Sequence, residues 1–172
     1  MQIKSKSRVE AHGEVYTNQK EVNDMLDLVQ YETQRIDSKF LEPACGNGNF
    51  LAEILNRKLK VIQDNYQLQQ DFEHRTLIAI SSIYGVDILQ DNVSESINRL
   101  CKIIYNLYCN LFNEINLNFC QSVLEIVSKN IICGNTLEDN LCFYEWSIVR
   151  TEIKYSKHYL KNMLENESGV LF

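Results

Sequence analysis

The sequence predicts an α/β fold with a parallel sheet, because short strand-like segments alternate with longer helical patterns. The strand-like segments are FLE at 40–42, LIAISSIYGVDI at 77–88 and NIICGN at 130–135. The run at 77–88 has no polar alternation, as expected of a strand buried on both faces. Strands that alternate with helices favour a doubly wound sheet, which binds ligands beyond the carboxyl ends of its strands. With three strands, the sheet is expected to be incomplete.

An amphipathic helix is expected before the first strand. The segment NQKEVNDMLDLVQYE, 18–32, places apolar residues at i, i+3, i+4 and i+7, and Asn18 can cap its first turn. These apolar positions are Val22, Met25, Leu26 and Val29. The preceding HGEVYT, 12–17, is expected to form a short extended turn.

Further helical patterns connect the strands. One helix is expected to begin near Asn49, and another to run through KVIQDNYQLQQDFEHR, 60–75. Residues 90–128 predict two helices divided near Asn116. The remainder, 137–172, is polar, aromatic and weakly periodic, and it predicts no second long strand.

Length and charge limit the function classes. A chain of 172 residues with 45% hydrophobic content forms one core. The formal net charge of −6 gives no general attraction to phosphate, although Lys4, Lys6 and Arg8 make a small basic head. We therefore expect weak affinity for nucleic acid from this chain alone.

Cysteine and histidine usage gives no sign of disulfides or metal. The six cysteines include no C-x-x-C pair, and neither a signal peptide nor a long apolar run is present. We expect a reduced, cytoplasmic protein without membrane contact. The three histidines lack the i, i+4 spacing of a metal-binding helix, so no metal is predicted.

The loop PACGNGN after the first predicted strand is expected to approach a ligand. Gly46 and Gly48 can adopt positive φ and expose bare backbone, and Asn49 can cap the next helix. Glu42 would repel phosphate and better suits a cationic group such as an α-ammonium. The third residue after Gly48 is Leu51, so the G-x-G-x-x-G dinucleotide fingerprint fails. A purely structural turn is the alternative.

The whole string FLEPACGNGNFL resembles the first motif of class I S-adenosylmethionine-dependent methyltransferases. Its form is typical of DNA adenine-N6 methyltransferases from restriction-modification systems. HGEVYTNQKEV resembles the family's tenth motif, IYGVDILQDNV the second and IICGNTLED the third, in the order of the gamma arrangement. The resemblance covers about residues 8–140 and implies a Rossmann-like fold and S-adenosylmethionine as cofactor.

The resemblance implies residues for the methionine end of the cofactor. Tyr16 and Thr17 match the family's contacts to the cofactor carboxylate, with a helix-capping segment as the alternative. Glu42, Ala44 and Gly46 would line the same end, with Gly48 completing the loop.

The resemblance also implies residues for the nucleoside end of the cofactor. Asp87 would accept both ribose hydroxyls in a bidentate fork, and Ile88 would lie against the adenine. Asn135 stands where the family often has Asp and could bond the adenine amino group. The alternatives are a solvated strand-end Asp87 and a turn asparagine at 135.

Three regions follow from these assignments: an N-terminal segment at 1–38, a cofactor-binding core at 39–140 and a C-terminal extension at 141–172. The extension carries aromatic residues that could stack on a flipped base. We predict instead that they belong to the core or to a hydrophobic edge. They are Phe143, Tyr144 and Trp146.

One motif of the family has no counterpart in the sequence. Adenine methyltransferases hold the target amine with Asn-Pro-Pro-Tyr, and Pro43 is the only proline here. No catalytic residue is therefore assigned, and the chain is expected to be inactive alone. A natural truncation, a split subunit and a cloned fragment all stay open.

The missing Asn-Pro-Pro-Tyr motif suggests partner proteins and leaves other functions open. DNA would be bound through elements that a complementary methyltransferase or specificity subunit supplies, and an exposed sheet edge predicts self-association. The alternative functions are a catalytically silent cofactor-binding or interaction protein, and a Rossmann-like protein for another nucleotide.

Overall fold

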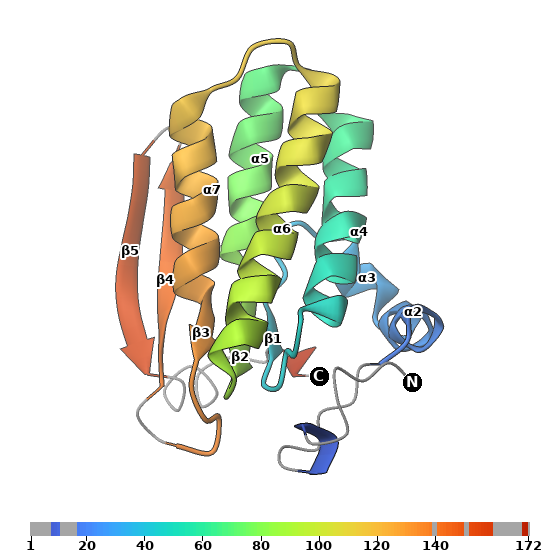
Figure 1. Ribbon diagram of the computed structural model, residues 1–172. Helices are drawn as coiled ribbons and strands as arrows, with labels where there is room; N and C mark the ends of the chain where they lie inside the picture. Colours follow the sequence, from blue (N-terminus) through green and yellow to red (C-terminus); the bar gives the residue numbers. More distant parts are fainter. Residues whose placement is uncertain (1–7, 11–16, 139–140, 150–151, 160–169, 172) are drawn as a thin grey trace.

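A parallel sheet lies at one end of the molecule. The computed structural model describes residues 8–10, 17–138, 141–149, 152–159 and 170–171. The sheet order is β3-β2-β1-β6, and neighbouring strands pair in parallel (Figure 1). The strands are β1 (Phe40–Glu42), β2 (Ile83–Asp87), β3 (Ile131–Cys133) and β6 (Val170–Leu171). Each of the three segments expected to form a strand contains one, although β2 and β3 are shorter than expected.

Two pairs of long helices connect the strands. The helices are α2 (Gln19–Asp27), α3 (Gln30–Thr33), α4 (Asn49–Asn65), α5 (Gln69–Ser81), α6 (Gln90–Leu111) and α7 (Leu117–Asn130). The pair α4–α5 joins β1 to β2, and the pair α6–α7 joins β2 to β3. These four helices pack side by side and extend well beyond the sheet (Figure 1).

Apolar stripes on the helices form the main core. In α4, Leu51, Ile54, Leu55 and Ile62 are almost fully buried, which is the i, i+3, i+4 spacing of a core-facing stripe. The helix ends follow local chemistry: Asn18 forms a capping box with Glu21 at the start of α2. Asn116 caps α7, as the predicted division of residues 90–128 required.

Two expectations about helix boundaries were wrong. Residues 60–75 are not one helix, because α4 runs to Asn65 and α5 begins at Gln69. The apolar run from Leu77 to Ser81 belongs to α5, and the strand begins only at Ile83. A helix enclosed by other helices is apolar on several sides, so its sequence reads like that of a buried strand.

Asn49 does not cap α4, which is a further correction. Gly48 occupies the N-cap position with φ of 80°, and Asn49 is the first helical residue. The amide of Asn49 instead donates to the backbone oxygen of Thr17 at 3.0 Å and accepts from Arg99. The side chain therefore ties the N-terminal region to α4 and α6.

The expectation of no second long strand after residue 137 was also wrong. Strands β4 (Cys142–Val149) and β5 (Glu152–Tyr159) form an antiparallel hairpin that packs against α5 and α7. Phe143 is 1% exposed and meets Tyr84 edge to face, and Trp146 packs on the main core. The prediction that these aromatics are core or edge residues is confirmed.

Asn130 joins the hairpin to the helices. Its buried amide nitrogen donates to the backbone oxygens of Ile80 at 3.2 Å and Ile83 at 3.1 Å. Its side-chain oxygen accepts from the Trp146 indole at 2.8 Å. One fully buried side chain thus connects the end of α5, the start of β2 and strand β4.

Lys58 holds the amino ends of the strands. Its side chain is fully buried, and its Nζ donates to the backbone oxygen of Ser38 and to Ser82 Oγ, both at 2.5 Å. Burial lowers the pKa of Lys58 to about 7. This amine links the segments that lead into β1 and β2.

We predict that Asn130→Leu lowers the free energy of unfolding by about 2–4 kcal/mol, because two buried carbonyls and the Trp146 indole lose their partner. Urea denaturation followed by circular dichroism measures this loss. Asn118→Leu, at an exposed position of the same helix, is the matched control and should change stability by less than about 1 kcal/mol. Equal losses for the two variants would contradict the joining role of Asn130.

Candidate functional site

The carboxyl ends of β1, β2 and β3 bring three loops together. The backbone nitrogen of Cys45 donates to the oxygen of Val86 at 2.8 Å, and that of Gly134 donates to the oxygen of Asp87 at 3.0 Å. Thr136 Oγ1 donates to the backbone oxygen of Pro43 at 3.1 Å. The loops of the first, second and third predicted motifs therefore form one surface at this edge of the sheet.

The glycine loop has the backbone that the sequence predicts. Gly46 and Gly48 have φ of 52° and 80°, a region that residues with side chains rarely adopt. A Cβ atom on Gly48 would lie 2.9 Å from Ser96 Oγ, so this glycine also permits close packing on α6. Ser96 Oγ donates to the backbone oxygen of Gly46 at 2.9 Å, which fastens the loop to that helix.

Asp87 is held by three protein donors. Its Oδ2 accepts from the backbone nitrogen of Gly46 at 2.9 Å. Its Oδ1 accepts from the nitrogen of Leu89 at 2.9 Å and from the Asn92 amide at 3.2 Å. A carboxylate offers about four acceptor positions, so one position on Oδ2 is left for a further donor. Asp87 thus fixes the glycine loop and keeps limited capacity for a ligand.

At the same edge, the Glu42 carboxyl group is desolvated and Asn47 carries an unsatisfied oxygen. Burial raises the pKa of Glu42 to about 7, and a hydrogen bond from the backbone of Ala44 opposes that shift. No cation of the described residues pairs with this carboxyl group. The side-chain oxygen of Asn47 is buried, and no described residue forms a hydrogen bond with it. Both groups would be stabilised by a ligand that brings positive charge or N–H donors.

The other predicted residues lie around these loops. Thr17 is next to the start of α4 through its bond from Asn49, Ala44 is exposed, and Ile88 is 53% exposed directly after β2. The oxygen of Asn135 accepts from the nitrogen of Leu137 at 3.1 Å, as in a turn. Tyr16 lies outside the described residues.

Two site residues escaped the sequence analysis. Asn92 is 1% exposed and Ser96 is fully buried, and both contact the glycine loop or its carboxylate. They stand four residues apart on α6, on the face that also buries Val93 and Leu100. Polar residues on the apolar face of a helix are the signal that could have identified them.

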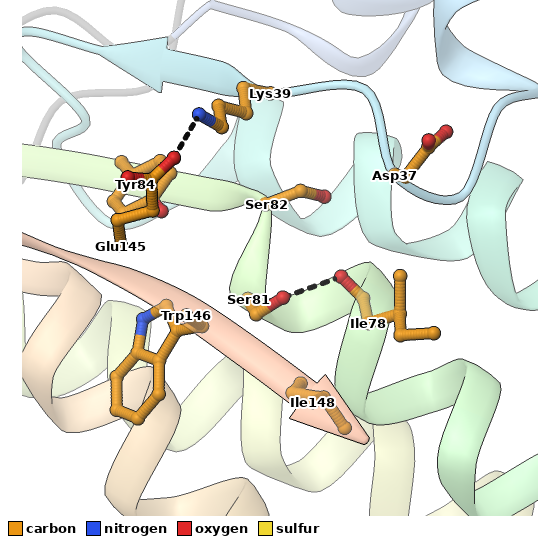
Figure 2. A pocket seen from close by; sticks show the side chains of 9 residues that line it. All are labelled: Asp37, Lys39, Ile78, Ser81, Ser82, Tyr84, Glu145, Trp146 and Ile148. Atoms are coloured by element: carbon orange, nitrogen blue, oxygen red, sulfur yellow. Dashed lines mark hydrogen bonds and ion pairs between the residues drawn. The ribbon is translucent and has the colours of Figure 1, made fainter. Parts of the chain in front are cut away.

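A separate pocket lies at the opposite edge of the sheet. It encloses about 150 Å³, and its lining includes Asp37, Lys39, Ser81 and Trp146 (Figure 2). Lys39 Nζ lies 3.0 Å from a carboxylate oxygen of Glu145 and lowers the pKa of that group. This ion pair fastens β4 to the segment before β1, and the described loops after β1, β2 and β3 do not line the pocket.

The family assignment rests on a comparison with protein-family models. The family described as MmeI, DNA-methyltransferase domain, matches residues 15–160, most of the chain. The chain belongs to this family. The searches of curated proteins and of solved structures gave no match. The predicted relationship to restriction-modification DNA methyltransferases is confirmed, and the matched region is the methyltransferase domain of such an enzyme.

Three further observations concern the cysteines, membrane-spanning helices and metal ligands. All six cysteines are free thiols. Among the described residues, no helix is long and apolar enough to cross a membrane. The same part of the chain contains no group of three or more His, Cys, Asp or Glu residues placed to hold a metal ion.

We predict that Glu42 makes the stability of the free protein depend on pH. Its pKa is about 7 in the folded state and about 4.5 when unfolded, so the folded state binds more protons between these values. Stability contributed by the protonated group is full below pH 4.5 and is lost as pH rises through 7. The unfolding free energy of the wild type, relative to Glu42→Gln, should fall by on the order of 2 kcal/mol from pH 5 to pH 8.

Urea titrations of both proteins at several pH values measure this difference. Glu125→Gln, at an exposed position of α7, is the control for loss of a surface charge. A pH-independent difference between wild type and Glu42→Gln would show that Glu42 is well solvated.

Proposed function

We propose that this chain binds S-adenosylmethionine as part of a DNA adenine-N6 methyltransferase with a class I, Rossmann-like fold. The observation that carries the proposal is the carboxyl edge of the sheet, where Asp87 fixes the glycine loop within the matched methyltransferase region. Parallel sheets bind ligands at this edge.

The groups at the edge fit this cofactor. The desolvated carboxyl of Glu42 suits an α-ammonium, and the Asn47 oxygen can accept from an N–H donor of the ligand. Asp87 offers its remaining acceptor position to the ribose, and exposed Ile88 offers an apolar surface to the adenine. Thr17 and Tyr16 are proposed for the cofactor carboxylate, with Ala44, Gly46 and Gly48 lining the methionine end.

Asn135 already makes contacts within its own turn. Its side-chain oxygen already accepts from the backbone of Leu137, and its amide lies 3.5 Å from Glu138. Binding adenine would require the turn to release at least one of these contacts. We therefore assign the adenine mainly to Ile88 and the neighbouring backbone.

The proposed chemistry depends on positioning. When bound, S-adenosylmethionine supplies a methyl group on a positively charged sulfur, which an adenine amine can attack in line. The residues of this chain would hold the two ends of the cofactor and orient the methyl group toward the acceptor. We propose that DNA is bound through elements from a complementary methyltransferase or specificity subunit, because no Asn-Pro-Pro-Tyr motif occurs in the sequence.

We expect isothermal calorimetry to show binding of S-adenosylhomocysteine, with NAD and ATP binding far more weakly. Asp87→Ala should weaken that binding by at least about tenfold, because the loop loses its anchor and the ribose loses a charged acceptor. Asp71→Ala, an exposed carboxylate in the first turn of α5, is the matched control. Unchanged affinity in folded Asp87→Ala would remove this residue from the site.

We also expect the purified chain to bind the cofactor without transferring methyl groups to DNA. A motif for the target amine is missing from the sequence, and the net charge of −6 gives little hold on duplex DNA. Labelled-methyl incorporation into duplex and single-stranded DNA measures this, with cofactor binding confirmed on the same sample. Sustained turnover that is lost in Asp87→Ala would show that the chain carries its own acceptor site.

A further inference from the structure

Arg8 is connected to Asp87 through one buried side chain. The Arg8 guanidinium contacts both carboxylate oxygens of Asp91, at 2.6 and 3.2 Å, and donates to the Asn92 side-chain oxygen at 3.3 Å. The Asn92 amide then donates to Asp87 at 3.2 Å. The path runs from residues 8–10, through the start of α6, to the carboxylate that holds the glycine loop.

The two charged neighbours orient the Asn92 amide. A guanidinium only donates hydrogen bonds, so the Asn92 oxygen faces Arg8. A carboxylate only accepts them, so the Asn92 nitrogen faces Asp87. Because Asn92 is 1% exposed, water does not compete for either group. The amide nitrogen is therefore held beside the acceptor that the ribose would use.

Asp87 has fewer acceptor positions left than the two hydroxyls of a ribose need. Two ribose hydroxyls that donate to Asp87 need two acceptor positions, and three protein donors leave one. The bonds from Gly46 and Leu89 are backbone bonds of 2.9 Å, and releasing either would move a loop. The bond from Asn92 is the longest of the three at 3.2 Å and comes from a side chain. It is the bond that a hydroxyl can replace with least rearrangement.

We propose that Asn92, oriented by Arg8, is a second ribose-reading residue. A ribose hydroxyl enters between the two side chains, donates to Asp87 Oδ1 and accepts from the Asn92 amide. Each polar atom keeps a partner, so Asn92 adds selectivity for the hydroxyl. The inference rests on the proposed cofactor and adds that residues 8–10 contribute to ribose recognition through Arg8.

The test compares two ligands in each protein. Calorimetry measures the affinity for S-adenosylhomocysteine and for an analogue that lacks both ribose hydroxyls. In the wild type, the hydroxyls should increase affinity by about 30–100-fold. Asn92→Leu, similar in shape but unable to donate, should reduce that ratio by about tenfold while the affinity for the dideoxy analogue changes by less than about twofold.

Arg8→Ala gives a second test that leaves the buried Asn92 in place. Without Arg8, the Asn92 oxygen loses a charged donor and the amide is oriented less firmly, so the ligand ratio should fall by about threefold and the dideoxy analogue should bind as before. Lys60→Ala removes an exposed ion pair with Asp64 on α4 and serves as the control, with the wild-type ratio. Arg8→Ala also decides the question if Asn92→Leu fails to fold.

The outcomes separate the inference from the proposed function. If the wild type binds neither ligand, the proposed cofactor is wrong and the inference falls with it. If the wild type discriminates and both variants keep its ratio, Asn92 is not a ribose-reading residue, although the cofactor assignment stands. An equal loss of affinity for both ligands would show a purely structural role and would also overturn the inference.

Discussion

The Asp87 carboxylate is the contact on which the candidate site depends. Asp87 is the last residue of β2, and its carboxylate accepts hydrogen bonds from the glycine loop after β1 and from the start of α6. The backbone oxygen of Asp87 accepts from Gly134 after β3. Strands of three to five residues could not fix three loops by their own pairing. A charged acceptor with several backbone donors supplies that rigidity, because charge-assisted bonds are the stronger ones.

The far ends of the strands are fixed by buried polar side chains as well. Lys58 joins the segments before β1 and β2, and Asn130 joins α5 and β2 to the hairpin. The helices extend beyond the sheet and bury most of the apolar surface, so they contribute most of the hydrophobic stability. The sheet therefore serves mainly as a frame that directs the loops, and polar contacts at both edges set its geometry.

Local chemistry decided how much of this could be predicted from the sequence. Positive φ at Gly46 and Gly48, the Asn18 cap and the division near Asn116 each depend on a few adjacent residues. The predicted start of the second strand at residue 77 was wrong, because α5 is enclosed by other elements and its apolar run resembles that of a buried strand. The hairpin was not predicted for a related reason. Phe143 packs on the sheet and Trp146 packs on the main core, so both faces of β4 carry apolar residues and its polar alternation is obscured. The contact between Arg8 and Asn92 joins residues 84 apart along the chain, so no local pattern contains it.

Satisfied and unsatisfied groups have different roles at the carboxyl edge. Asp87 is nearly saturated by the protein, so it fixes the shape of the loops before any ligand arrives. Glu42 is half-buried and desolvated, and the Asn47 oxygen has no hydrogen-bond partner among the described residues, so both cost stability in the free protein and favour a ligand with positive charge and N–H donors. A ligand that satisfies them recovers this free energy without having to reorganise the loops. The edge thus combines a nearly saturated carboxylate that preorganises the loops with a desolvated one that favours a cationic ligand, which is the division of roles that the proposed cofactor would require.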